Sequence, residues 1–282
     1  MISKRAWSQK GSSRPRLTVQ SLGEYSYAIP EVARERTSLL TSCIQFAMVL
    51  FFPISLSLFT VFTGIMTAGP KSWRMAIISR MIPMMMKRMK TKTLNQRKLL
   101  LQHLKGRVLD VGSGGGAYFS LFKDKASHVV ALEPVSKMHD TIRHEAQKAC
   151  FHDFQITIST QTVEEYASSH PTEKFDWVIL GNVLCEVENQ KSTLEAINRL
   201  LIEGGHVYFS EHLAAHPSTF TRNFQNFINP WWRRVSGGCN CNRDSLHALE
   251  GMAEWDVISW QMNNLKVFSV PIVMGLARKV TA

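Results

Sequence analysis

The sequence predicts an α/β fold with a mostly parallel sheet over residues 99–282, preceded by an N-terminal helical segment that associates with a membrane. Two observations predict the sheet: short apolar runs alternate with amphipathic stretches, and a glycine-rich turn follows the first of these runs. A third observation predicts the membrane segment, because no charged residue occurs between Thr37 and Pro70. Residues 1–36 are polar and basic without periodicity, which favours a flexible tail.

The predicted strands and helices follow one another along the chain. Apolar runs predict strands at residues 107–112, 128–134, 154–160, 175–183 and 206–214. Helical patterns begin at residue 117 and cover residues 136–149 and 189–205, the last ending at a pair of glycines. Two more apolar stretches, 254–263 and 266–280, are joined by a short polar turn and predict an antiparallel pair at the sheet edge.

The basic charge of the chain belongs to its N-terminal part. The formal net charge is +11, and residues 1–100 hold 16 of the 33 Lys and Arg residues but only 3 of the 22 Asp and Glu residues. The predicted α/β domain is therefore close to neutral. Enzymes of nucleic acid more often carry positive charge around the domain that binds it, so we expect no nucleic-acid partner.

The uncharged run over residues 37–70 predicts a membrane anchor or hairpin. Its 34 residues would form a helix of about 51 Å, whereas the hydrocarbon core is about 30 Å thick. Pro53 lies near the midpoint and would break or kink such a helix. A re-entrant hairpin is favoured, and a single tilted span is the alternative. Basic residues flank both ends, so the α/β domain faces the cytosol under either model.

Residues 71–98 predict a basic amphipathic segment at the membrane interface. Met and Ile alternate there with Lys and Arg, and Trp73 stands where an interfacial aromatic residue is expected. A positive amphipathic segment suits the anionic cytosolic leaflet. The alternative is a plain helix whose methionines fill the core of the next domain.

The five cysteines are scattered and odd in number, which favours a reducing compartment over a disulfide framework. Cys239 and Cys241 form a lone C-x-C motif. Zinc sites usually combine two such pairs, so we interpret these residues as ordinary thiols and expect no metal.

The glycine-rich turn predicts a ligand site. Gly112, Gly114 and Gly116 stand at a strand end with Ser113 between them, and they would let a ligand approach the backbone closely. Dinucleotide enzymes share such a turn. Asp110 distinguishes a dinucleotide site from a site for a ligand with an ammonium group, because its carboxylate would repel a pyrophosphate and attract the ammonium group. The pattern therefore disfavours an NAD(P) oxidoreductase.

Two further polar residues are expected at the same edge of the sheet. Glu133 ends the second predicted strand, where a carboxylate can accept hydrogen bonds from both hydroxyls of a ribose. Asn182 ends the fourth predicted strand. The carboxyl ends of parallel strands lie at one edge, so we expect both residues near the glycine turn.

In this order the motifs "VLDVGSGGG", "ALEP", "FDWVILGNVLCEV" and "RLLIEGGHVYF" resemble those of class I S-adenosylmethionine-dependent methyltransferases, over about residues 95–282. The resemblance implies a Rossmann-like class I methyltransferase fold with a seven-stranded sheet, and S-adenosylmethionine as the cofactor. Glu203 departs from the family's usual proline, and "STQTVEEY" departs from its usual G-D-A-E. The cofactor-binding residues that we infer are Asp110, Gly112, Ser113, Gly114, Gly116, Glu133, Thr162, Val163 and Asn182, with adenine contacts at Thr162 and Val163.

A more specific resemblance lies in "VLCEVENQ", "GGHVYFSEHLAAHPST", "INPWWRRVSGGCNCNRDSLHALE" and the apolar N-terminal segment. These are similar to the methyltransferase-like protein 7 group, membrane-anchored enzymes of the endoplasmic reticulum and lipid droplets that are implicated as thiol S-methyltransferases. The resemblance implies a small hydrophobic acceptor, with an alkyl thiol favoured. A lipid or quinone methyltransferase would share the cofactor motifs and is the alternative. A non-catalytic membrane scaffold that keeps the cofactor fold is disfavoured by the intact Asp110 and Glu133, and the oligomeric state is left open.

A catalytic base is optional for thiol methylation, since a thiol already ionises at a pH of about 8.5. His212, at the end of the fifth predicted strand, is the candidate general base, with a structural histidine as the alternative. Cys185 is expected to be a small apolar residue that lines the pocket. Trp231 and Trp232 either form a pocket wall or pack a lid.

Overall fold

The computed structural model describes residues 64, 68, 93–263 and 271–280. Contacts divide the chain into two units, Met1–Arg34 and Glu35–Ala282, and all of the described residues belong to the second unit. The predicted tail, the membrane run and most of the interfacial segment lie outside the described residues. Within the described part of the chain, no helix combines the length and the apolar character that crossing a membrane requires.

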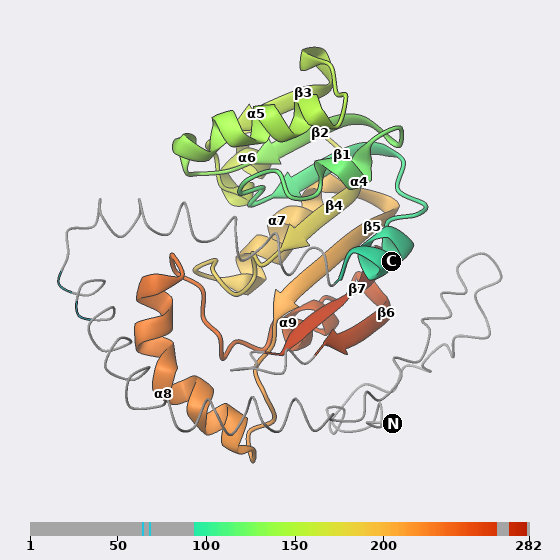
Figure 1. The fold of residues 1–282 in the computed structure, drawn as a ribbon. Helices are drawn as coiled ribbons and strands as arrows, with labels where there is room; N and C mark the ends of the chain where they lie inside the picture. Colours follow the sequence, from blue (N-terminus) through green and yellow to red (C-terminus); the bar gives the residue numbers. More distant parts are fainter. Residues whose placement is uncertain (1–63, 65–67, 69–92, 264–270, 281–282) are drawn as a thin grey trace, which may run out of the picture. The chain divides into compact units, whose positions relative to one another are not determined.

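In the described part, seven strands form one sheet in the order β3-β2-β1-β4-β5-β7-β6 (Figure 1). Strands β1 to β5 pair in parallel, whereas β7 runs antiparallel to both of its neighbours. The predicted fold class is confirmed for this part. The last strand of the chain is not at the edge, however, because β7 lies between β5 and β6. The bounds are β1 Gly106–Val111, β2 Ala126–Leu132, β3 Ile156–Ser159, β4 Phe175–Gly181, β5 Leu201–His212, β6 Trp255–Asn263 and β7 Ile272–Lys279.

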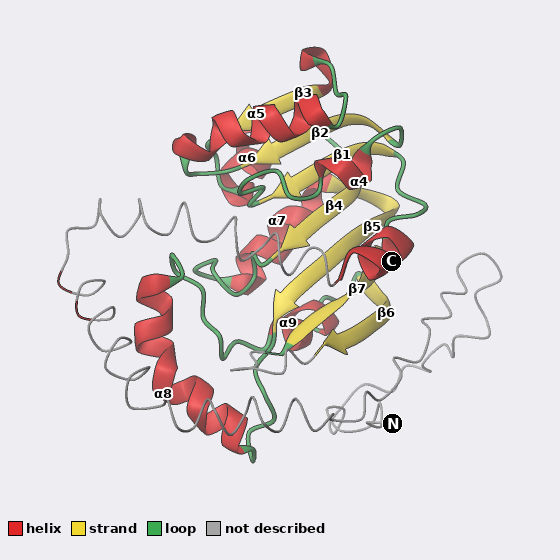
Figure 2. Cartoon of the chain, in the orientation of Figure 1, coloured by secondary structure: helices red, strands yellow, loops and turns green. Residues whose placement is uncertain are grey.

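Helices cover both faces of the sheet (Figure 2). Helices α4 and α5 pack together on one face, and α6, α7 and α9 pack on the other. Residues 93–100 are also helical and precede β1. The bounds are α4 Phe119–Phe122, α5 His139–Lys148, α6 Val163–Ser169, α7 Gln190–Leu200, α8 Phe220–Val235 and α9 Ser245–Glu250.

Successive side chains of a strand point to opposite faces of the sheet, so apolar side chains form a core on each face. Leu109 and Val111 of β1 are buried in a cluster with Ile197 of α7. On the other face, the rings of Phe119 and Phe151 meet edge to face with centroids 5.8 Å apart. The central strands are buried on both faces, as expected for a sheet covered by two layers of helices.

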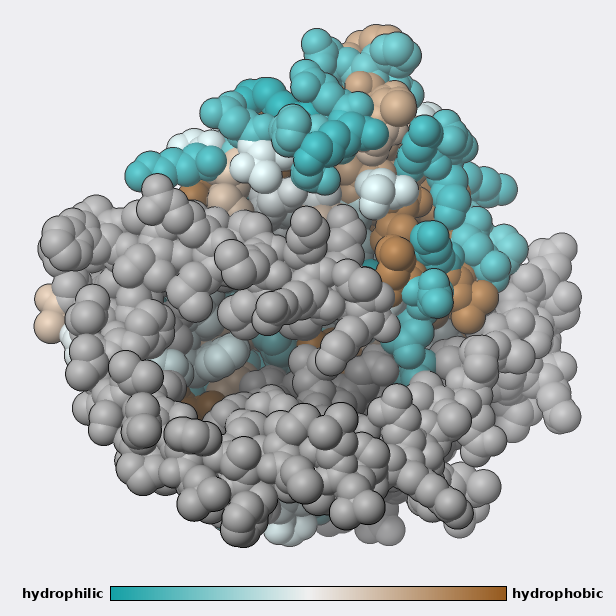
Figure 3. Space-filling view, viewed as in Figure 1, coloured by the Kyte–Doolittle hydropathy of each residue, from teal (hydrophilic) through white to brown (hydrophobic). Residues whose placement is uncertain are grey.

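Helix α5 shows how the outer surface is built. Only Ile142 and Ala146 of this helix are buried, and the rest of its side chains face solvent or lie at the boundary. Figure 3 shows mainly hydrophilic side chains over α5 and β3 on the side in view. An amphipathic helix of this kind covers the sheet with one narrow apolar stripe.

The helix predicted over residues 189–205 ends earlier, at Leu200, and the pair of glycines belongs to β5. Leu201 has extended backbone angles and pairs with Phe175 of β4, so strand pairing begins before the glycines. Gly204 has a φ of +75°, which allows the irregularity in this part of the strand. Pairing with a neighbouring strand therefore overrides the local helix-stop signal.

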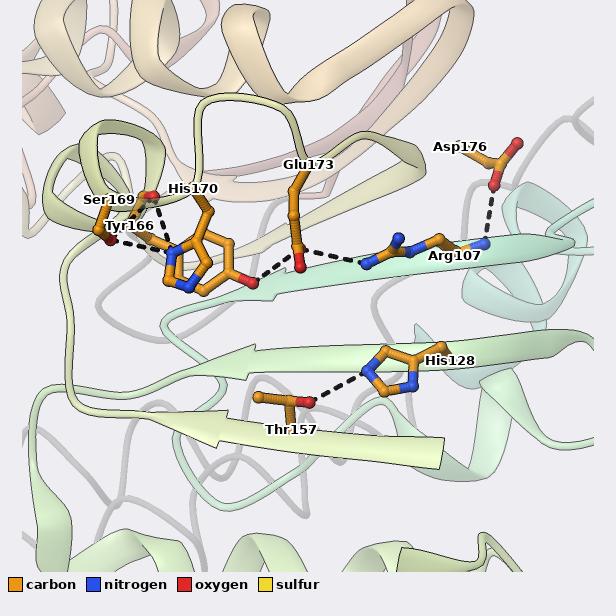
Figure 4. Close-up of polar contacts among 8 residues, drawn as sticks. All are labelled: Arg107, His128, Thr157, Tyr166, Ser169, His170, Glu173 and Asp176. Atoms are coloured by element: carbon orange, nitrogen blue, oxygen red, sulfur yellow. Dashed lines mark hydrogen bonds and ion pairs between the residues drawn. The ribbon is translucent and has the colours of Figure 1, made fainter. Parts of the chain in front are cut away.

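Polar contacts connect neighbouring elements at the end of the sheet where β1, β2 and β4 begin (Figure 4). The Asp176 carboxylate accepts a hydrogen bond of 2.8 Å from the backbone N–H of Arg107. Glu173 accepts from the Tyr166 hydroxyl at 2.8 Å and pairs with the Arg107 guanidinium at 3.1 Å. His128 and Thr157 join β2 to β3 at 3.1 Å. The opposite edge, where the parallel strands end, holds the candidate site.

Candidate functional site

The glycine corner directly follows β1 and has the backbone that its sequence predicts. Gly112, Gly114 and Gly116 have φ angles of +61°, +56° and +70°. A Cβ on Gly112 would lie 2.9 Å from Val183 Cγ2, so the loop after β4 packs directly on the corner. The N–H of Ser113 donates to the carbonyl of Leu132 at 3.0 Å, which joins the corner to the end of β2. The corner is thus held between the two neighbouring strands.

Asp110 is buried in β1 below this corner, with 1% of its surface exposed. Its Oδ2 accepts a hydrogen bond of 2.6 Å from the Ser113 hydroxyl. Burial raises the pKa of Asp110 to about 7; the Ser113 hydrogen bond opposes this shift and the charge of Glu133 adds to it. A cation placed beside Asp110 would favour the ionised carboxylate, as the predicted ammonium contact requires.

Glu133 follows β2 and connects the predicted ligand residues to one another. Its Oε2 accepts from the N–H of Gly114 at 2.8 Å, and its Oε1 accepts from the N–H of Val135 at 2.9 Å. His139 donates to the backbone carbonyl of Glu133 at 2.8 Å. Each carboxylate oxygen has two lone pairs, so the carboxylate can still accept hydrogen bonds from a ribose.

The remaining predicted cofactor residues lie in two places. Asn182 has a φ of +62° at the end of β4, and its N–H donates to the carbonyl of Ser210 at 2.8 Å. Thr162 caps α6 by accepting from the N–H of Glu165, and the side chain of Val163 is buried in the core. The side chains of Thr162 and Val163 thus already have structural partners, and their predicted adenine contacts stay predictions.

Arg97 is a buried cation that the sequence pattern did not indicate. Its side chain is 1% exposed, and its Cζ lies 5.0 Å from the centroid of the Tyr118 ring. Its Nε and Nη1 have no hydrogen-bond partner among the residues that the structure describes. Burial raises the pKa of Tyr118, Arg97 lowers it and the charge of Asp110 raises it, so both charges act on this ring. A buried guanidinium with free donors is suited to an anionic ligand group.

A second group of side chains gathers where β4 and β5 end. Cys185 lies in the loop after β4, His212 ends β5, and Cys239 follows α8. The Cys239 Sγ lies 3.1 Å from the Cys185 Sγ and 3.1 Å from His212 Nδ1. The Trp232 ring meets the His212 ring edge to face at 6.4 Å between centroids. Cys185 is therefore not only an apolar lining residue, as the sequence suggested, and one half of the C-x-C motif takes part in a polar cluster.

The three members of this cluster influence each other's protonation. The hydrogen bond from Cys185 lowers the pKa of Cys239, and the His212 contact lowers it further against the opposing effect of burial. The pKa of Cys185 is raised well above its ordinary value by its hydrogen bond with Cys239 and by burial. For His212, burial lowers the pKa, but the contact with Cys239 and the charge of Glu211 together raise it above its ordinary value. The cluster thus lowers the pKa of Cys239, whose Sγ lies 3.1 Å from His212 Nδ1.

Two carboxylates stand around the cluster. Glu211 is fully buried, and it accepts from the N–H groups of Val183 at 2.8 Å and Cys185 at 3.3 Å. Glu186 lies beside Gly238, since a Cβ there would be 3.3 Å from Glu186 Cγ. Burial raises the pKa of Glu186 to about 7, and the charges of Cys239 and Glu133 add to this shift. Glu186 thus packs against the glycines that precede Cys239.

Residues 86–255, more than half of the chain, match the family model described as a methyltransferase domain. The chain belongs to the methyltransferase domain family. The activity class expected from the sequence is thereby confirmed, and the cofactor of this class, S-adenosylmethionine, is the predicted one. The residues present fit it, because a buried Asp110 and the free donors of Arg97 provide opposite charges for an amino-acid group.

Curated relatives of this methyltransferase carry two kinds of name. The human thiol S-methyltransferase TMT1A is 30% identical over 145 residues, which is 51% of this chain and 57% of the relative. The rat thiol S-methyltransferase TMT1B is 24% identical over 176 residues, 61% of this chain and 70% of the relative. A ubiquinone biosynthesis O-methyltransferase from Klebsiella pneumoniae is 32% identical over 104 residues, 37% of this chain and 41% of the relative. The matched stretch thus spans little more than half the length of TMT1A.

Solved structures share the fold at low sequence identity. The YcgJ protein from Bacillus subtilis superposes with a TM-score of 0.55 at 12% identity, covering 68% of this chain and 100% of its own. A putative methyltransferase from Bacillus halodurans gives a TM-score of 0.53 at 18% identity, covering 66% of this chain and 98% of its own. These similarities confirm the Rossmann-like class I methyltransferase fold of the described part.

Proposed function

We propose that this methyltransferase transfers the methyl group of S-adenosylmethionine to a small hydrophobic thiol. The observation that carries the proposal is the position of the cluster of Cys185, His212 and Cys239, which lies at the same sheet edge as the glycine corner. A buried lining of sulfur, imidazole and indole suits a soft, apolar acceptor. The names of the TMT1A and TMT1B relatives support the same acceptor class.

In this proposal the chain's own residues hold the cofactor at three points. Asp110 binds the ammonium group, Arg97 binds the carboxylate, and Glu133 accepts hydrogen bonds from the ribose. The glycine corner leaves room for the ligand beside the backbone, because Gly114 has no side chain and a Cβ there would meet only one atom, at 3.9 Å. When bound, S-adenosylmethionine supplies an electrophilic methyl group.

The protein must then place an ionised acceptor in line with that methyl group and exclude water. The segment after α8 covers this edge: Asn240 donates from its backbone N–H, at 2.7 Å, and from its Nδ2, at 3.1 Å, to the carbonyl of Cys185. The general-base role of His212 stays a prediction from the sequence, because its Nδ1 already lies 3.1 Å from Cys239 Sγ. Its contact with Cys239 makes it a group that also stabilises negative charge on sulfur.

Transfer to a quinone ring or a lipid is the second candidate function, and the similarity to the ubiquinone biosynthesis O-methyltransferase favours it. A screen of radiolabelled methyl transfer separates the two functions. The full chain, in detergent or on liposomes, receives alkyl thiols, hydroxylated quinones or phospholipids as acceptors. Transfer to thiols that accelerates as the pH approaches the thiol pKa supports the proposal. Transfer to a quinone or lipid without response to thiols replaces it with the second function.

We also propose that residues 37–70 anchor the enzyme in the membrane of the endoplasmic reticulum or lipid droplets, with the methyltransferase domain on the cytosolic side. The support is the uncharged run and its basic flanks. A membrane anchor would place the site close to hydrophobic acceptors that partition into the bilayer.

A further inference from the structure

Three side chains with metal-binding atoms converge from distant parts of the chain. Cys185, His212 and Cys239 offer two sulfur atoms and one imidazole nitrogen, which all lie within 4.8 Å of one another. Both cysteines are buried and neither forms a disulfide. Among the residues that the structure describes, no fourth histidine, cysteine or carboxylate joins the group.

We propose that Cys185, His212 and Cys239 bind a zinc ion whose fourth position takes the sulfur of the thiol substrate. Two thiolates and one imidazole are a known ligand set of catalytic zinc, in which three protein ligands leave one position open. Soft sulfur donors also select zinc over magnesium and calcium. The inference rests on the proposed function, because the open position is assigned to a thiol acceptor.

The geometry requires only a small adjustment for the ion. With Zn–S distances of about 2.3 Å, two sulfur ligands of a tetrahedral zinc lie about 3.8 Å apart. The Cys185 and Cys239 sulfur atoms are 3.1 Å apart. Cys239 follows Gly237 and Gly238, which have φ angles of +86° and +128°. Glycine adopts such angles readily, so these two residues allow the turn that brings Cys239 to the cluster.

The backbone around the three ligands is already fixed, as a metal site needs. The N–H of Cys185 donates to the buried carboxylate of Glu211, and its carbonyl accepts from Asn240. His212 is the last residue of β5 and pairs with Ile272 of β7. The ligands therefore come from a strand and from two segments that are hydrogen-bonded to each other.

The neighbouring cysteine of the motif provides an internal contrast. The Cys241 Sγ lies 3.6 Å from the carbonyl of Gln225 and 3.5 Å from Asn229 Oδ1, and it does not join the group. A pair of ordinary packed thiols would give Cys239 no reason to meet an imidazole nitrogen. A disulfide between Cys185 and Cys239 would need a sulfur separation of about 2.05 Å, whereas the two sulfur atoms lie 3.1 Å apart.

The cluster lies where a bound thiol could reach the cofactor. Val183, two residues before Cys185, contacts the glycine corner at Gly112. Glu186, the residue after Cys185, lies beside Gly238, which directly precedes Cys239. The metal and cofactor sites therefore share the loop after β4.

The chemistry balances without an oxidant or reductant. The substrate thiol loses its proton to solvent as its sulfur joins the zinc ion, which lowers the thiol pKa. That sulfur then forms a bond to the methyl carbon while the bond between methyl and sulfonium breaks, and the electron pair of the broken bond stays on the leaving S-adenosylhomocysteine. The product thioether carries no charge and leaves the zinc, so one thiol and one S-adenosylmethionine give one thioether, one S-adenosylhomocysteine and one proton.

Metal content tests the site directly. The full chain is expressed with added zinc and purified in detergent, and its zinc is measured by mass spectrometry. We expect about one zinc per chain, and at least a fivefold loss in each of Cys185→Ser, Cys239→Ser and His212→Ala. Cys241→Ser and Cys150→Ser are matched controls and should keep the full amount. Equal zinc in all five variants means an adventitious metal and overturns the proposal, as does a wild-type chain that neither contains zinc nor takes it up.

Cobalt spectroscopy keeps the test valid if a ligand variant fails to fold. Co²⁺ added to the metal-free wild-type chain should give the visible bands of a tetrahedral ion and a thiolate-to-metal charge-transfer band. Benzyl mercaptan should change these bands, whereas p-cresol should not. A stoichiometric loss of two free thiols on mild oxidation, with no cobalt spectrum, would assign the pair to a disulfide instead.

The two proposals can fail separately. If the thiol coordinates the metal but no labelled methyl group is transferred to any thiol, the proposed function fails and the zinc site stands. If thiols are methylated at the full rate by a chain that binds no metal, the zinc site fails and the proposed function stands.

Discussion

The backbone N–H of Gly114 donates a hydrogen bond of 2.8 Å to Glu133 Oε2. This bond joins the turn after β1 to the acid after β2, so one carboxylate both shapes the glycine corner and faces the proposed ribose position. Loss of the Glu133 carboxylate would therefore remove the hydrogen bond that shapes the glycine corner and the proposed hydrogen bonds to the ribose. Both losses would weaken cofactor binding.

Glu133→Ala should weaken binding of S-adenosylhomocysteine by about tenfold to a hundredfold, because hydrogen bonds to a charged group contribute roughly 1.5–3 kcal/mol. Isothermal titration calorimetry measures the affinity. Glu195→Ala is the control, since Glu195 is half-exposed on α7 and pairs with Lys191 at 3.9 Å. Wild-type affinity in Glu133→Ala, with an unchanged circular dichroism spectrum, would contradict the assignment.

Asp110 should make cofactor binding depend on pH. Its pKa is about 7 in the ligand-free protein, so below pH 7 the carboxyl group is protonated and must release a proton to bind an ammonium group. The affinity for S-adenosylhomocysteine should therefore fall about fivefold to tenfold between pH 7.5 and pH 6. Titrations in two buffers of different ionisation enthalpy should show the released proton.

Two controls isolate the effect of Asp110. Asp110→Asn should bind S-adenosylhomocysteine weakly with no pH dependence in this range. Methylthioadenosine lacks the ammonium group, so its affinity for the wild-type chain should not change with pH. The same pH dependence in Asp110→Asn would show that another group is responsible.

Arg97→Gln should weaken binding of S-adenosylhomocysteine about tenfold or more and leave the affinity for methylthioadenosine unchanged, since only the former ligand has a carboxylate. Arg143→Gln is the control, because Arg143 is exposed and pairs with Asp140 on α5. Equal weakening of both ligands would indicate that Arg97 stabilises the fold rather than the carboxylate.

Gly112→Ala should lower the free energy of unfolding by about 1–3 kcal/mol, because the backbone has a φ of +61° and the new methyl group would meet Val183 at 2.9 Å. Gly115→Ala is the matched control; its methyl group would meet only Thr141, at 3.5 Å. Chemical denaturation followed by tryptophan fluorescence measures both. Val183→Ala in the Gly112→Ala background should restore part of the loss, and an unaffected Gly112→Ala protein would contradict the packing.

The membrane hairpin predicts that the N-terminal tail stays in the cytosol. Glycosylation acceptor sites placed in residues 1–36 should remain unmodified in a protein that resists carbonate extraction. A glycosylated tail would place it in the lumen and support the single tilted span. Release by carbonate would contradict membrane insertion altogether.

The sequence by itself determined the parts of the site that depend on near neighbours. These parts are the glycine corner, Asp110 and Glu133, which lie at or near the ends of predicted strands. Their roles depend on local requirements, namely the backbone freedom of glycine and the charge of a carboxylate. The alternation of strands and helices is also local, because each element needs an apolar face of the right period. These features allowed the fold class and the cofactor edge to be predicted.

Only the tertiary structure decided which distant residues meet. β7 enters the sheet between β5 and β6 because strand pairing is a long-range contact that no periodicity specifies. Arg97 is buried against Tyr118 although its own segment is basic and reads as interfacial. Cys185 and Cys239 are 54 residues apart, so the C-x-C spacing gave no indication that these two residues meet. Their contact with His212 exists only because β4, β5 and the segment after α8 end at one edge of the sheet.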